Sequence, residues 1–242
     1  MTANGSDPKT QEHLEDHRAV ILLRSALIGA ATALPIPAVG DMLASALSRG
    51  LIYHVARLRY VDIDEAAVDE LLTQSPKKQR MSVLSAVGGL ISLVGRRIKL
   101  RRVFAGLAVL RGVEAGARAF HVATLFEHYC ARHHSGLVIH AADARRLRDT
   151  IDEAMDTTQR EMSSALFDQV ATQGLQLLQI VPKWAWAQLT HGVAEPPLPA
   201  LAAIAHEART WLADVSVRRY LAHVVGSFDR QWNGGQGTSS HS

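Results

Sequence analysis

The sequence contains few cysteines, few aromatic residues and no alternating strand pattern of useful length. A single cysteine, Cys130, excludes an internal disulfide framework and suits a reducing compartment. Phe, Trp and Tyr make up only 5% of the 242 residues, whereas Ala, Leu and Val dominate. This composition favours helices over sheets. We therefore expect an all-α fold, a multi-helix bundle.

Long hydrophobic runs are also missing. The uncharged residues 25–40 number only 16 and include two prolines, and the uncharged residues 81–95 number 15. A membrane-spanning helix needs about 20 apolar residues, and 15 residues of helix extend only about 22 Å against a hydrocarbon core of about 30 Å. A simple span is therefore not expected. Two interpretations remain open for each stretch, a shallow segment at a lipid surface and a helix in a protein core.

The common catalytic motifs are absent as well. The sequence has no Gly-x-Ser-x-Gly, no phosphate-binding glycine loop followed by Lys-Ser/Thr, and no dinucleotide fingerprint. The carboxylates of 62–70 and 149–156 lie where exposed helix faces need charge. Solvation of these faces explains them better than paired-acid catalysis does. We therefore predict no catalytic residues and no cofactor.

What is present begins with a proline pair. Leu34-Pro35-Ile36-Pro37 divides the weakly charged region 19–58 into two arms, and because proline ends helices we expect an N-terminal αα-hairpin around this Pro-x-Pro turn. Small residues recur at every fourth position in both arms, which lets helix backbones approach closely. We predict that the arms touch along these two stripes, Ser25, Gly29 and Ala33 in the first arm and Gly40, Ala44 and Ser48 in the second.

Helix signals continue downstream. Asp64 is a candidate N-cap for a short helix over 65–72, and Asp143 is a candidate N-cap for a long one. In the long helix, Arg148 and Asp152 are four residues apart and predict an ion pair on the exposed face of a surface helix.

The longest predicted helix covers 103–129, where Ala108, Gly112 and Gly116 predict another close crossing. The organisation that follows from these signals has four parts: a flexible N-terminal segment over 1–18, a helical core with the hairpin over 19–135, a C-terminal helical lobe over 136–232 and a flexible tail over 233–242.

Positive charge is concentrated in two clusters, although the net charge is only +3. Each Lys or Arg near an anionic lipid surface contributes about 1 kcal/mol of attraction, so an anionic membrane surface is one expected partner. A protein partner on an exposed helix face is another. Nucleic acid is a less favoured alternative, because the clusters lack interleaved aromatics. The candidate lipid- or partner-binding residues are Lys77, Lys78, Arg80, Arg96, Arg97, Lys99, Arg101 and Arg102.

The histidines suggest a metal hypothesis. On a helix, Glu127, Cys130 and His134 project to one side at i, i+3 and i+7, and all three are types that zinc accepts. Their spacing matches no zinc finger or metalloprotease. Alternative roles are a buried thiol for Cys130, a bond within the core for His128, and compensation of the negative helix C-terminus by His133 together with His134.

A resemblance follows from the N-terminal pattern. Leu34-Pro35-Ile36-Pro37, then Gly40-Asp41, an Ala/Leu/Arg-rich helix and Val61-Asp62-Ile63-Asp64 resemble bacterial helical proteins of unknown function related to the domain attached to small dynamin-like or Era-like GTPases. The resemblance covers about residues 19–72 and implies a helical fold and association with membranes. It implies no catalytic residues, and this chain has no nucleotide-binding domain of its own.

These signals lead to one expected function and one alternative from another class. We expect a non-enzymatic peripheral membrane-associated or scaffold protein, cytoplasmic and peripheral on the inner face of the plasma membrane, because residues 1–16 are polar and acidic and carry no signal peptide. The alternative is a metal-dependent or small-molecule enzyme that uses the His121–His134 region.

Overall fold

The computed structural model describes residues 8–33, 37–73, 100–136, 138–161, 206 and 208–234. These residues are 88% helical, which confirms the predicted all-α bundle. Residues 235–242 of the predicted flexible tail and the basic residues between 77 and 99 lie outside the described residues, and the predicted two-part division of the helical body stays a prediction. None of the described helices combines the length and apolar character that crossing a membrane would require.

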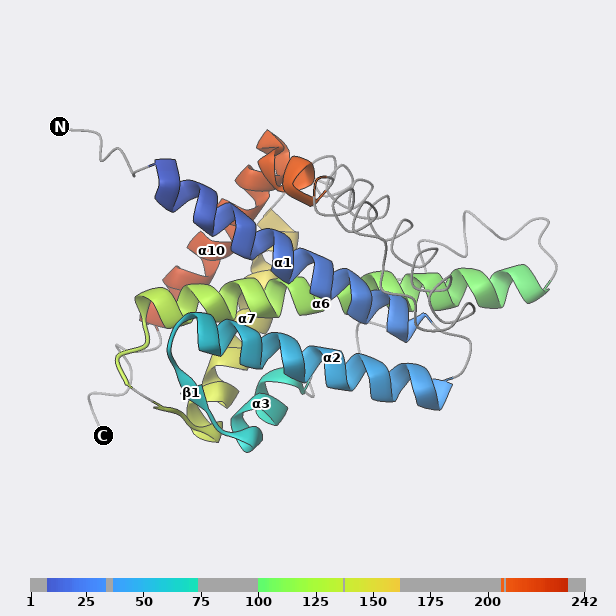
Figure 1. The fold of residues 1–242 in the computed structure, drawn as a ribbon, viewed down its shortest axis with the longest axis horizontal. Coiled ribbons are helices and arrows are strands. Elements are labelled where there is room, and N and C mark those ends of the chain that lie inside the picture. Colours follow the sequence, from blue (N-terminus) through green and yellow to red (C-terminus); the bar gives the residue numbers. More distant parts are fainter. Residues whose placement is uncertain are drawn as a thin grey trace.

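The N-terminal hairpin consists of α1 (Pro8–Thr32) and α2 (Pro37–Leu58), which run antiparallel (Figure 1). This confirms the hairpin that the two prolines predicted. α2 begins at Pro37, where the missing amide costs nothing because the first helical amides have no partner within the helix. Its other end closes through Tyr60, which has a left-handed φ of 54° and lets the Val61 amide donate to the Ala56 carbonyl at 3.0 Å.

The longest of the described helices, α6 (Leu100–Arg132), crosses α1 at a glycine contact. A Cβ atom added to Gly29 would lie 2.5 Å from the Gly112 carbonyl oxygen and 3.4 Å from the Gly116 Cα. The close crossing predicted for Gly112 and Gly116 is therefore confirmed. The predicted partner of the first stripe was wrong, because Gly29 faces α6 rather than α2. A stripe of small residues shows that a helix can be approached closely, but does not say by which neighbour.

Two residues of the second stripe lie beside a cavity that α1 and α6 both line. Ala44 and Ser48 line a cavity of about 310 Å³ together with Ile28 and Thr32. Arg118 is the charged side chain of this lining, and its guanidinium already binds Asp152 at 2.7 Å. The cavity therefore offers packing space between helices rather than a reactive site.

A short helix, α3 (Glu65–Leu72), follows the hairpin. The Asp64 carboxylate accepts a hydrogen bond from the Ala67 amide at 2.6 Å, which confirms the predicted N-cap. Immediately before it, β1 (Asp62–Ile63) pairs in parallel with β2 (Val138–Ile139). This two-residue pairing ties the start of α3 to the start of α7 (Ala141–Glu161).

The helix α7 lies at the surface and is buried along one stripe, as predicted, but the prediction of its N-cap and of the pairing of its charges was wrong. The helix begins at Ala141, so Asp143 lies in its first turn rather than at its N-cap. Arg148 and Asp152 are only 7% and 4% exposed and do not form the predicted pair. Arg148 binds Glu70 of α3 at 2.9 Å, and Asp152 binds Arg118 of α6 at 2.7 Å. Neighbouring helices supply opposite charges in better geometry than the next turn of the same helix does.

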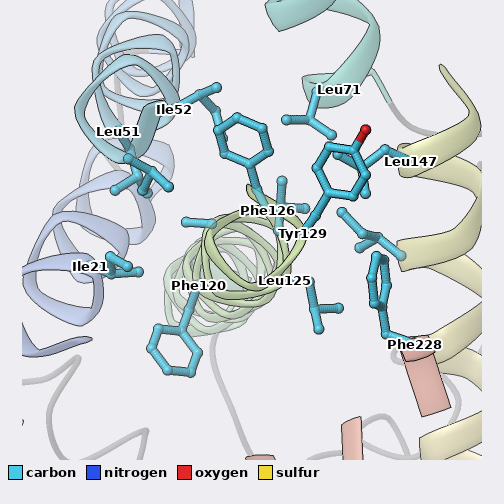
Figure 2. Close-up of a cluster of buried hydrophobic side chains, with 14 of the residues drawn as sticks. Ile21, Leu51, Ile52, Leu71, Phe120, Leu125, Phe126, Tyr129, Leu147 and Phe228 are labelled. Carbon is cyan, nitrogen blue, oxygen red and sulfur yellow. The ribbon is translucent and has the colours of Figure 1, made fainter. Parts of the chain in front are cut away.

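The hydrophobic core is built around α6. Figure 2 shows Phe126 and Tyr129 of this helix directed toward Ile52 of α2 and Leu147 of α7. One cluster of buried side chains includes members from α1 through α10 (Val215–Gly234), among them the fully buried Phe228. The C-terminal end of α6 is therefore surrounded by α3, α7 and α10, and its polar side chains meet residues from distant parts of the chain.

Candidate functional site

The predicted basic cluster is only partly within the described residues. Arg101 and Arg102 belong to the first turn of α6, and their side chains are not described. The remaining six candidate residues lie between 77 and 99, outside the described ranges. Their role in binding lipid or a partner stays a prediction.

Exposed apolar side chains gather near the start of α2. Val39, Met42 and Leu43 are 52%, 75% and 39% exposed, within two turns of the proline hairpin. The start of α2 and the start of α6 lie toward the same end of the long axis of the molecule (Figure 1). The exposed apolar side chains of α2 and the first turn of α6, which contains Arg101 and Arg102, therefore lie toward the same end of the protein.

The three metal candidates from the sequence do not form a site. The Glu127 carboxylate accepts a bond from the Arg59 guanidinium at 2.7 Å, and Glu127 is buried. Burial raises the pKa of the Cys130 thiol to about 12, which opposes the thiolate that zinc requires. His134 packs its ring at 5.8 Å from the ring of Tyr129. A metal-ligand grouping of the described residues does not include any of these three side chains.

His121 is also committed to a structural contact. Its Nδ1 lies 2.7 Å from the Ala117 carbonyl oxygen, and its Nε2 lies 2.6 Å from the Tyr220 hydroxyl. A carbonyl only accepts, so Nδ1 carries a proton, and in the neutral imidazole Nε2 then accepts from the hydroxyl. Burial raises the pKa of Tyr220 to about 12, which keeps that hydroxyl protonated as the donor.

A different set of side chains does converge. His128 Nε2 and His133 Nε2 lie 2.7 Å and 2.8 Å from the same oxygen, Oδ1 of Asp229. The three prospective ligand atoms all lie within 4.8 Å of one another. The side chains of His128, His133 and Asp229 are 17%, 16% and 34% exposed, so the cluster is sheltered but open to solvent.

The end of α6 explains how the two histidines meet. His133 follows the last residue of the helix, and its amide still donates to the Tyr129 carbonyl at 2.8 Å, which extends the helical winding by one residue. The His128 and His133 rings therefore lie edge to face with centroids 5.7 Å apart. Phe228 contacts both rings at 6.0 Å and positions them from the α10 side.

Asp229 supplies the negative charge of the cluster. Burial alone raises the pKa of this carboxyl, but hydrogen bonds from His133 and His128 and their charge together lower it below its ordinary value. The side chain is therefore ionised at neutral pH. A carboxylate and two imidazoles facing one point form a donor set that fits a divalent transition metal.

Sequence reasoning singled out the histidine region but missed Asp229. The carboxylate is separated from His128 by 101 residues and lies in another helix. The one available signal was its place beside Phe228, at the edge of the inward stripe of α10. Helical periodicity shows that such an edge residue is partly sheltered, but it does not say what the residue meets.

Comparison with known proteins identified no relative of this chain. No family model, no curated protein and no solved structure matches this chain. The resemblance to the domain attached to small dynamin-like or Era-like GTPases therefore stays a prediction.

Proposed function

We propose that this protein is a non-enzymatic peripheral membrane protein that docks on an anionic lipid surface through the end of the molecule where α2 and α6 begin. The observation that carries the proposal is the exposure of Met42, which is 75% accessible beside Val39 and Leu43. Apolar side chains of this size are normally turned inward, and an uncovered group of them favours contact with lipid or with a partner.

Charge favours lipid over a neutral apolar partner. Arg101 and Arg102 lie in the first turn of α6, and Arg96 and Arg97 immediately precede that turn in the sequence. The start of α6 lies toward the same end of the molecule as the start of α2 (Figure 1). Each cation near an anionic surface adds about 1 kcal/mol, and a few shallow apolar side chains add the second attraction that stable peripheral binding requires.

Vesicle flotation tests this proposal. Vesicles of phosphatidylcholine with phosphatidylglycerol should carry the protein at low salt and release it at about 1 M salt, where the Debye length falls to about 3 Å. Vesicles of phosphatidylcholine alone should bind little. Replacing Arg96, Arg97, Arg101 and Arg102 by Gln should reduce the floated fraction on anionic vesicles.

A matched pair of variants tests the apolar contribution. Met42→Ser removes the exposed side chain at the proposed lipid-facing end, whereas Val215→Ser removes a side chain that is 71% exposed at the start of α10. Only Met42→Ser should weaken flotation. Wild-type protein that stays with the unbound fraction at low salt would contradict the proposal, and arginine-dependent binding to duplex DNA without flotation would favour the nucleic-acid alternative.

A further inference from the structure

The strongest unassigned feature is the convergence of His128, His133 and Asp229. We propose that these three side chains form a binding site for one divalent transition metal ion of the zinc type, with Nε2 of each imidazole and the Asp229 carboxylate as ligands. The site joins the end of α6 to α10 and is independent of the proposed lipid-binding end.

The observed spacing is close to what a zinc ion needs. With metal–ligand bonds of about 2.0–2.2 Å, two ligands of a tetrahedral ion lie about 3.3 Å apart. The two nitrogen–oxygen distances are 2.7 Å and 2.8 Å, so each nitrogen needs to move away from the oxygen by about half an ångström. The two imidazole nitrogens lie within 4.8 Å of each other and need to reach the same spacing. Both hydrogen bonds use Oδ1 of Asp229, and rotation of the carboxylate can also offer Oδ2 to the ion.

The surroundings favour a bound ion that keeps contact with solvent. Phe228 contacts both imidazoles, and Trp232 lies 6.1 Å from the His133 ring, so the rings are held by a rigid apolar wall. The ligand side chains are 16–34% exposed, which leaves a route for an ion from water. Three protein ligands leave one tetrahedral position open, as in zinc sites that retain a water molecule rather than in closed structural sites.

The chemical class of the metal follows from the donor atoms. Two imidazoles and one carboxylate suit Zn²⁺, Co²⁺, Ni²⁺ and Fe²⁺, whereas Mg²⁺ and Ca²⁺ require oxygen ligands throughout. Binding replaces the hydrogen bonds between the imidazoles and Asp229 with metal–ligand bonds, and the proton on each Nε2 is released to solvent or replaced by one on Nδ1. In the absence of an ion the same three residues act as a clamp between α6 and α10.

Zinc titration of untagged, chelator-treated full-length protein tests the proposal. Calorimetry and metal analysis after gel filtration should give a single bound zinc ion in the wild type. Asp229→Asn keeps an acceptor for both histidines but is a poor metal ligand, and His133→Gln keeps a donor to Asp229. Each substitution should weaken zinc affinity by more than about 100-fold, because the loss of an outer-shell partner alone costs about 10–100-fold.

His140 provides a matched control. Its Nδ1 lies 3.3 Å from Asp64 Oδ2, a histidine–carboxylate contact that belongs to no metal-ligand grouping among the described residues. His140→Gln should therefore leave zinc affinity unchanged. The proposal would be overturned if the wild-type protein bound no zinc, or if the Asp229→Asn and His133→Gln variants bound zinc as tightly as the wild type. The three residues would then form only a hydrogen-bonded clamp.

A second measurement does not depend on the folding of any variant. Zinc should protect His128 and His133 of the wild-type protein from diethyl pyrocarbonate, read as modified peptides by mass spectrometry. His140 should react equally with and without zinc. Protection of His128 and His133 alone supports the site, whereas unchanged reactivity of both histidines contradicts it.

Discussion

At the scale of single residues, Tyr220 has the clearest consequence for pH dependence. Its hydroxyl donates to His121 Nε2 at 2.6 Å, and burial raises its pKa from 10.0 to about 12. His121 is the titratable group that faces it from α6. Because the folded state favours the neutral phenol, the stabilisation that it provides is complete below pH 10 and is lost as the pH rises from about 10 to about 12.

Tyr220→Phe should therefore flatten the alkaline loss of stability. The wild-type free energy of unfolding should fall more steeply above pH 10 than that of the variant, by up to about 2–3 kcal/mol, since one pKa unit corresponds to about 1.36 kcal/mol. Urea unfolding at a series of alkaline pH values measures this difference. The part of the tyrosinate absorbance that appears at the highest pH should also shrink in Tyr220→Phe. It should not shrink in Tyr60→Phe, because Tyr60 is 93% exposed. Identical alkaline slopes of the unfolding free energy in the wild type and Tyr220→Phe would refute this assignment.

At the scale of secondary-structure elements, the crossing of α1 and α6 depends on the absence of a side chain at Gly29. A Cβ atom there would lie 2.5 Å from the Gly112 carbonyl oxygen, and backbone atoms cannot move aside as a flexible side chain can. Two helices held at this distance must therefore separate when either glycine gains a side chain.

Gly29→Ala should lower the free energy of unfolding by about 1–3 kcal/mol, because overpacking outweighs the gain in helix propensity. Gly50→Ala in α2 is the matched control, since its added Cβ meets nothing within 4 Å. That variant should be more stable by up to about 1 kcal/mol, the helix-propensity difference between alanine and glycine. Denaturant unfolding of both variants measures the contrast, and equal effects of the same sign would count against the close crossing.

The charges of α7 show why element-scale expectations can fail. Arg148 and Asp152 have the spacing of an intrahelical ion pair, yet they bind Glu70 and Arg118 of neighbouring helices. The spacing predicted that opposite charges would be satisfied. It did not predict that both side chains would be nearly buried between helices.

At the scale of the whole molecule, one cluster of buried side chains connects α1, α2, α3, α6, α7 and α10. Phe126 lies within this cluster and is completely inaccessible. A shared core of this kind predicts cooperative unfolding of all described helices, with the predicted C-terminal lobe packed on the N-terminal core.

Phe126→Ala should lower the free energy of unfolding by about 3–5 kcal/mol, the cost of removing a large buried aromatic side chain. Far-ultraviolet circular dichroism and tryptophan fluorescence, the latter including Trp232 of α10, should report one coincident transition in the wild type and in the variant. Two separate transitions, with only one of them shifted by the substitution, would indicate independent lobes.

Much of the fold could be predicted locally. Pro35 and Pro37 determined where the first helix pair is divided, and Asp64 determined the start of α3, because both effects act within one turn of the backbone. The glycines of α6 likewise indicated that some helix approaches closely. Such features depend on neighbours in sequence, so the sequence alone determines them.

The partners of these elements were decided only in three dimensions. Gly29 meets α6 instead of α2, and Asp229 reaches His128 across 101 residues of chain. Periodicity identifies which face of a helix is apolar or lined by small residues, but it does not say which other helix packs against that face. The partner is decided by the close packing of all the helices together. Several helices and helix ends could thus be predicted from the sequence. The crossing partners and the histidine–aspartate cluster exist only because tertiary packing brings distant residues together.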